Sequence, residues 1–271
     1  MIFSLITTSF ASNSQSNDIV IIDSSDFSIS IPNVEKSVNS RDVSINAAAA
    51  SNVLNLQYQL LKNNTTCEIW AEYTWLSYTG TAPTKVSVDL SIKKYTSRTS
   101  SSVTKSQKSY INIVMGTTYS TDTVSTTAGS AFWQLATTTT QVLNGSSSSM
   151  DKNSGITLLN AAAKEYPIYT DPISMKSLTE PTATNWTKVS NPISSLNSSQ
   201  LSAFRTWYQN TYWNGQAIDW STREVHHIKP RIYGGTHDYS NLIVLNKDFH
   251  RQTVTPWWRN YNPSDSLEVF D

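Results

Sequence analysis

The sequence predicts an α+β protein of two domains: an N-terminal antiparallel β-sandwich, then a small ββα domain with a preceding helix. Three observations support this. Apolar and polar residues alternate through much of the first half, the region around 144–196 lacks periodicity, and all four histidines lie within residues 225–250. A chain of 271 residues is long enough for two hydrophobic cores.

Residues 1–49 are predicted to be a leader. Ser9-Phe10-Ala11 follows a short apolar run and fits the small-x-small pattern of a signal cleavage site, yet the first basic residue is Lys36. Two interpretations stay open: the tail of a longer signal peptide, and a polar leader without regular structure. The first favours a secreted protein, and a cytoplasmic location stays open. No apolar run is long enough to predict a membrane span.

Residues 50–143 are predicted to form the β-sandwich. Apolar side chains occupy every second position in residues 54–60, 67–75 and 86–92. A period of two buries one face of a strand. Short strands separated by turn residues at regular spacing are typical of antiparallel sandwiches. The aromatic residues of these strands are expected in its core, and the domain offers no catalytic constellation.

The stretch VSVDLSIKKYTSRTSSSVTKSQKSY, with its alternating runs and Lys-Lys pair, resembles small secreted β-sandwich domains of Gram-positive bacteria. Residues 144–196 are predicted to be a linker, with one short helix at ITLLNAAAKEY. Residues 197–271 are predicted to form the second domain. Asn197-Ser198-Ser199-Gln200 has the pattern of a capping box, and the apolar residues that follow have helical spacing.

The stretch VHHIKPRIYGGTHDYSNLIVLNKDFH predicts a strand, a turn, a second strand and a helix. Adjacent side chains of an extended strand point to opposite sides, so His226 and His227 cannot have the same role. His250, on the helix, can come back across the hairpin to meet His226 around a metal ion. Cys67 is the single cysteine, so the ligands of such an ion must be nitrogen and oxygen atoms.

This arrangement resembles the HNH endonucleases, the ββα-metal or His-Me finger group, and in particular the HNH domains of bacterial secreted toxins such as the nuclease colicins. The resemblance covers roughly residues 218–261. The matching residues are Glu224-x-His226-His227-Ile228-x-Pro230, Gly234-Gly235, Asn241-Leu242-x-x-Leu245 and His250. It implies that His226 and His250 bind one metal ion, that His227 is the general base, and that Asn241 holds the loop and orients this base.

The resemblance also has departures. The colicins have a third histidine ligand at the position of Val254, so two protein ligands completed by water are expected here. A histidine at the first ligand position favours a softer ion than magnesium. The implied cofactor is one divalent ion, Mg²⁺, Mn²⁺, Ni²⁺ or Zn²⁺. His237 matches no family role and is expected to be an ordinary turn residue.

The resemblance implies hydrolysis of phosphodiester bonds in DNA, with RNA left open. Four basic residues are candidates for phosphate contacts: Arg223, Lys229, Arg231 and Arg251. Twenty basic residues balance twenty acidic ones, so attraction would depend on their placement. The hypothesis is a secreted bacterial antagonistic or nutritional nuclease, with an immunity protein as a partner. The alternative is a surface- or glycan-binding protein whose histidine module only holds a structural metal.

Overall fold

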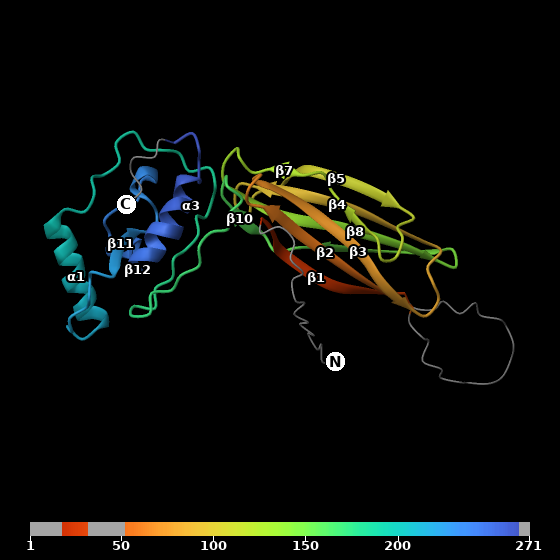
Figure 1. Ribbon diagram of the computed structural model, residues 1–271, viewed down its shortest axis with the longest axis horizontal. Coiled ribbons are helices and arrows are strands. Elements are labelled where there is room, and N and C mark those ends of the chain that lie inside the picture. The colour runs from red at the N-terminus through yellow and green to blue at the C-terminus, as the bar shows by residue number, and fades with distance from the viewer. Residues whose placement is uncertain (1–17, 32–51, 266–271) are drawn as a thin grey trace.

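The protein has two parts, a β-sandwich and a smaller mixed domain, which lie end to end (Figure 1). The structure is a computed structural model, and it describes residues 18–31 and 52–265. Its strands are antiparallel, and its helices lie in the C-terminal part. The predicted fold class, α+β with two domains, is therefore confirmed.

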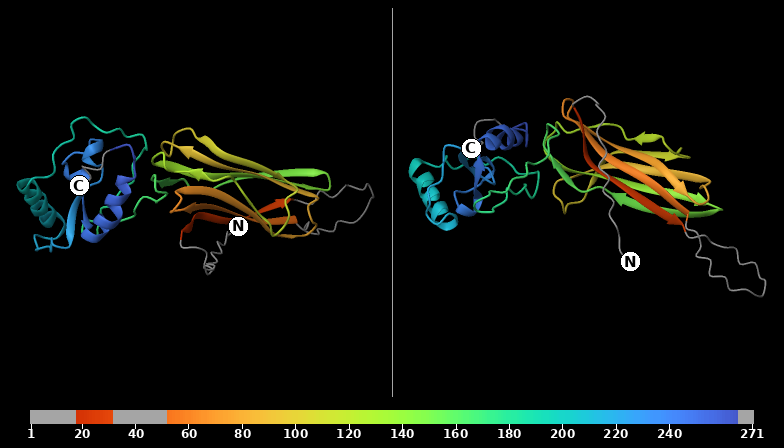
Figure 2. Two further views of the ribbon diagram at one scale, coloured as in Figure 1. Left: turned by 45° about the horizontal axis from the view of Figure 1, so that its top comes forward. Right: turned by 60° about the horizontal axis from the view of Figure 1, so that its bottom comes forward.

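The sandwich consists of two sheets that lie face to face, as Figure 2 shows. One sheet has the order β1-β2-β3-β6, with β7 also paired to β3, and the other has the order β10-β8-β4-β5, with β9 also paired to β8. The strands of the first sheet are β1 (Ile19–Ile31), β2 (Asn52–Asn63), β3 (Glu68–Thr79), β6 (Thr118–Ser120) and β7 (Val124–Ser125). Those of the second are β4 (Lys85–Tyr95), β5 (Val103–Ile111), β8 (Ala131–Leu143), β9 (Ser146–Asn153) and β10 (Thr157–Leu159).

The alternation in the sequence corresponds to the inner faces of these sheets. Leu54, Leu56 and Leu60 of β2 are buried together with the alternating apolar residues of β3, in the same sheet, and of β4, in the facing sheet. Cys67 is the exception. It is half-buried in the turn before β3, where its φ of 55° lies outside the extended region.

The predicted leader includes a strand of the sandwich. Residues 19–31 form β1, which pairs along its length with β2 and buries Phe27 and Ile29. The boundary at residue 49 was therefore wrong for this segment, because its many serine and aspartate residues hide the two buried positions. The proposed cleavage site at Ser9-Phe10-Ala11 and Lys36 lie outside the described residues.

The predicted linker begins with two further strands. β9 is the edge partner of β8, and its exposed serines gave no alternation from which a strand could be predicted. The short helix predicted at 156–166 was wrong, since Leu158 and Leu159 are buried in β10. A turn follows, in which the Asn160 side chain accepts hydrogen bonds from the backbone N–H groups of Ala162 and Lys164, both at 3.0 Å.

The second domain contains the predicted helix and the predicted ββα unit. The elements are α1 (Ser198–Tyr212), β11 (Arg223–His227), β12 (Leu242–Asn246), α2 (Lys247–Phe249), a π-helical turn (His250–Val254) and α3 (Thr255–Arg259). Asn197 and Gln200 form the predicted capping box at the start of α1. Phe204 and Tyr208 of α1 are buried against β12.

The two domains share a buried aromatic core. Trp257, Trp258 and Tyr261 pack in one cluster with Phe132 of β8 and Leu158 of β10. Backbone hydrogen bonds cross the same junction: the Ser130 N–H donates to the Tyr261 carbonyl at 2.8 Å, and the Ala161 N–H to the Asn260 carbonyl at 2.9 Å. Residues 257–261 are therefore held against the sandwich. No helix among the described residues has the length and apolar character that a membrane crossing requires.

We expect Trp258→Ala to lower the free energy of unfolding of the whole protein by ~3–5 kcal/mol, because a fully buried indole is lost from the core of both domains. Urea unfolding followed by tryptophan fluorescence and by circular dichroism measures it. Trp213→Ala is the matched control, since Trp213 is 42% exposed. An unchanged sandwich transition in Trp258→Ala would contradict a shared core.

Candidate active site

The ββα unit brings the four histidines together as two pairs on different sides of β11. β11 and β12 are antiparallel, with His226 opposite Ile243 and His227 opposite Leu242. His250 begins the π-helical turn that follows α2. The alternation along β11 directs His226 to the helix and His227 to the loop, as expected from the sequence.

The first pair consists of His226 and His250. Nδ1 of His226 lies 3.0 Å from Nε2 of His250, and both side chains are buried. Two imidazole nitrogens that bind one ion at about 2.0–2.1 Å are about 2.9–3.4 Å apart for bond angles between roughly 90° and 110°. The observed separation therefore fits two ligands of a common cation.

The protonation state of His226 also fits metal binding. Burial lowers the pKa of His226 well below its usual 6.5, and the neighbouring His250 and His227 lower it further. His226 is therefore neutral at pH 7, the state in which imidazole binds metals. Its Nε2 is buried without a hydrogen-bond partner among the described residues. Within residues 18–31 and 52–265, no three His, Cys, Asp or Glu side chains form a metal-binding cluster.

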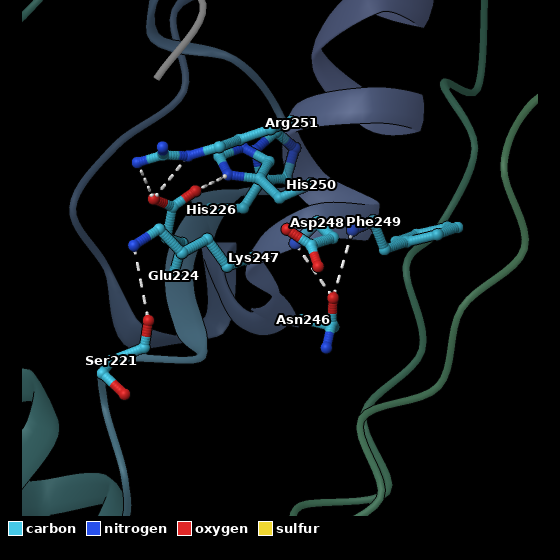
Figure 3. Close-up of polar contacts among 9 residues, drawn as sticks. All are labelled: Ser221, Glu224, His226, Asn246, Lys247, Asp248, Phe249, His250 and Arg251. Carbon is cyan, nitrogen blue, oxygen red and sulfur yellow. Dashed lines mark hydrogen bonds and ion pairs between the residues drawn. The ribbon is translucent and has the colours of Figure 1, made fainter.

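Glu224 links His250 to Arg251, as Figure 3 shows. Its Oε2 lies 2.9 Å from Nδ1 of His250, and its Oε1 accepts from Nε of Arg251 at 2.9 Å. Burial raises the pKa of Glu224, but the hydrogen bonds from Arg251 and His250 outweigh this and lower it overall. The carboxylate fixes the ring of His250 so that Nε2 faces His226, the usual arrangement of a carboxylate behind a metal-binding histidine.

The helix that carries His250 is locally widened into a π-helical turn, His250–Val254. Such turns are frequent at functional sites. Val254 lies at its end, fully buried in the aromatic core with Trp257 and Trp258. The position that carries a third histidine in the colicins therefore serves packing in this protein.

The second pair consists of His227 and His237. Nε2 of His227 lies 3.0 Å from Nδ1 of His237, with ring centroids 5.2 Å apart. His227 is 3% exposed and His237 is half-buried. His237 lies in the predicted turn, and its ring also contacts the predicted base, which the sequence did not lead us to expect. Its spacing of ten residues from His227 across a Gly-Gly turn was the one available signal.

Asn241 closes the loop between the two strands. Its Oδ1 accepts from the Lys229 N–H at 2.9 Å, and its Nδ2 donates to the carbonyls of Lys229 at 3.2 Å and Thr236 at 2.9 Å. Gly235 permits the tight turn, because a Cβ there would lie 1.8 Å from the Lys229 carbonyl oxygen. The Asn241 side chain thus holds the backbone of the loop that follows His227.

Lys176, from the segment predicted as linker, holds the same loop from outside. Its half-buried ammonium donates to the carbonyls of Tyr239 at 3.1 Å and Leu242 at 2.8 Å, and also to that of Ser240. Burial lowers the pKa of Lys176. The sequence carried no sign of this contact, because the two segments are more than sixty residues apart.

The four basic candidates have different surroundings. Arg251 is exposed beside the first histidine pair, and the Lys229 ammonium lies 5.0 Å from the centroid of the Trp186 ring. Arg223 is half-buried at the start of β11. Arg231 departs from the expectation of a phosphate contact, because it is buried and donates to the Ile193 carbonyl at 2.8 Å.

Comparison with protein families identifies this region. Residues 215–253 match the family model for HNH endonucleases. This stretch contains β11, the loop, β12 and the helical turn that begins at His250. Comparison of the chain with curated proteins and with solved structures gives no match. The C-terminal part is thus an HNH domain, of a family whose members generally use a divalent metal ion and act on nucleic acid.

We expect the metal-free protein to lose stability as the pH falls below about 6.5. The unfolded chain then binds a proton at His226 that the folded protein excludes, because burial lowers the pKa of His226 in the folded state. Chemical denaturation in the presence of a chelator, at several values between pH 7.5 and pH 5.5, measures how the free energy of unfolding changes with pH. His226→Gln should reduce this pH dependence. An equal pH dependence in the wild type and the variant would contradict a buried, neutral His226.

We expect Glu224→Gln to weaken metal binding by roughly 10–100-fold, because the carboxylate that orients His250 is lost. Calorimetric titration with Mn²⁺, Ni²⁺ and Zn²⁺ measures the affinity. Glu180→Gln is the matched control, since Glu180 accepts two hydrogen bonds from Arg98, far from the histidines in sequence. Equal metal affinity in the two variants would show that Glu224 has no such role.

Proposed function

Because the C-terminal part of this chain is an HNH domain, we propose that the protein hydrolyses phosphodiester bonds of DNA with one divalent metal ion. The observation that carries the proposal is the 3.0 Å separation of His226 Nδ1 and His250 Nε2 inside a ββα unit. Four polar side chains are in contact there: the two imidazoles, the carboxylate of Glu224 and the guanidinium of Arg251. Such a set suits the binding of a cation and of a phosphate group.

In the proposed reaction His227 is the general base. A neutral imidazole can accept a proton from water. The water oxygen bonds to phosphorus, its proton passes to His227, and the bond between phosphorus and the 3′ oxygen breaks. When bound by His226 and His250, the metal ion supplies Lewis-acid stabilisation of the phosphate and the leaving oxygen.

The basic side chains near the site would bind the substrate backbone. Arg251 is exposed beside His250 while Glu224 holds its guanidinium, so the remaining N–H groups can donate to a phosphate. Lys229 and Arg223 are further candidates on the loop and on β11. Because the net charge of the chain is zero, these few contacts would supply most of the attraction.

The biological role that we propose is a secreted bacterial antagonistic or nutritional nuclease, with the sandwich serving attachment, delivery or protection. The toxin-like pattern from Glu224 to His250, with its neighbouring histidine pair, supports this role. An antagonistic nuclease would endanger the cell that makes it, so an immunity protein that covers the histidine site would be its partner. The binding-protein alternative predicts metal binding without cleavage.

The test is incubation of the purified protein with plasmid DNA, or with RNA, and Mg²⁺, Mn²⁺, Ni²⁺ or Zn²⁺. We expect metal-dependent cleavage that falls by roughly 10²–10⁴-fold in His227→Ala, because the general base is lost. His250→Ala should lose both cleavage and metal affinity, whereas His227→Ala should lose cleavage but retain metal affinity. Cleavage of RNA alone would overturn the DNA assignment. Metal binding without any cleavage would support the binding-protein alternative.

A further inference from the structure

A half-buried imidazole contacts the proposed base and has no role in the reaction described above. Nδ1 of His237 lies 3.0 Å from Nε2 of His227, and the ring planes are inclined by 43°. Two imidazole nitrogens form a hydrogen bond only when one carries the proton and the other has its lone pair. The contact therefore couples the tautomers of the two rings.

The backbone on both sides of His237 is fixed by hydrogen bonds, so the contact is built into the loop. The Thr236 carbonyl accepts from Nδ2 of Asn241 at 2.9 Å, and the Asp238 carbonyl accepts from the Asn241 N–H at 2.8 Å. The Gly235 N–H donates to the Pro230 carbonyl at 3.0 Å. One asparagine thus holds the residues that flank His237 on either side.

We propose that His237 is a positioning residue, which accepts a hydrogen bond from His227 and keeps the basic lone pair of His227 on Nδ1. This inference rests on the proposed function of His227. A neutral imidazole has one N–H and one lone pair. If Nε2 of His227 accepted the bond, its Nδ1 would carry the proton and no lone pair would remain for water. The contact is compatible with a basic His227 only when its Nε2–H donates to His237.

The same contact is compatible with the product of the proton transfer. An imidazolium has an N–H at both nitrogens, so Nε2 of His227 still donates to Nδ1 of His237 after Nδ1 of His227 has taken the proton of water. The ring therefore need not turn during the reaction. Orientation of a catalytic histidine through its second nitrogen is the same physical device that a buried carboxylate provides in hydrolase triads.

The test compares His237→Ala, His237→Asn and Thr236→Val with the full-length wild-type protein. The side-chain oxygen of asparagine lies where Nδ1 of histidine lies, so His237→Asn keeps the acceptor. Thr236→Val is the matched control, because it removes the hydrogen bond from Thr236 Oγ1 to Asp238 at 2.7 Å in the same turn but leaves the imidazole pair. Thermal unfolding shows that each variant is folded.

We expect kcat to fall by roughly 10–100-fold in His237→Ala, with KM and metal affinity unchanged. His237→Asn should recover most of this loss, and Thr236→Val should show none. A loss in His237→Asn as large as in His237→Ala, or an equal loss in Thr236→Val, would overturn the positioning role.

The imidazole ¹⁵N shifts of His227 give a readout that does not require activity. We expect protonated Nε2 and unprotonated Nδ1 in the wild type and in His237→Asn, and a mixture of tautomers in His237→Ala. If no nucleic acid is cut, the proposed function fails, while these spectra still decide whether His237 sets the tautomer. An unchanged His227 tautomer in His237→Ala would overturn the inference even in an active enzyme.

Discussion

The alternation of side chains along β11 determines the arrangement of the candidate site. Because His226 and His227 are adjacent in an extended strand, they lie on opposite faces and meet different partners. The His226 imidazole contacts His250 of the helical turn, and the His227 imidazole contacts His237 of the loop. A shift of one residue in the pairing with β12 would exchange the two faces, so the register of this short ribbon is the constraint on which both pairs depend.

The aromatic core gives this short ribbon its support. Two five-residue strands bury too little surface to be stable alone. Trp257 and Trp258, on the helix that follows His250, pack in one cluster with Phe132 and Leu158 of the sandwich. α1 covers β12 with Phe204 and Tyr208. The segment 160–196 adds contacts such as that of Lys176, so the loop and the helix are held in place by parts of the chain distant in sequence.

Patterns that depend on neighbouring residues were readable in the sequence. The buried faces of β2, β3 and β4, the capping box at Asn197 and the ββα order all follow from local spacing and were confirmed. β1 and β9 were missed because edge strands with serine on both faces show no alternation. The contact of Lys176 with the loop could not be predicted, because it depends on how distant segments fold together, and the spacing of His237 from His227 gave only a weak signal for their contact. The ligand and base roles of His226, His250 and His227 stay predictions.

The junction between the domains has a consequence for how the molecule can come apart. Main-chain bonds from Tyr261 and Asn260 to the sandwich, together with the indoles beside them, join the two halves independently of the peptide that connects them. Cleavage of the chain at the exposed Ile168 would therefore leave both fragments joined by these contacts. Release of the histidine-bearing half would require loss of these backbone hydrogen bonds and exposure of the buried aromatic cluster to water.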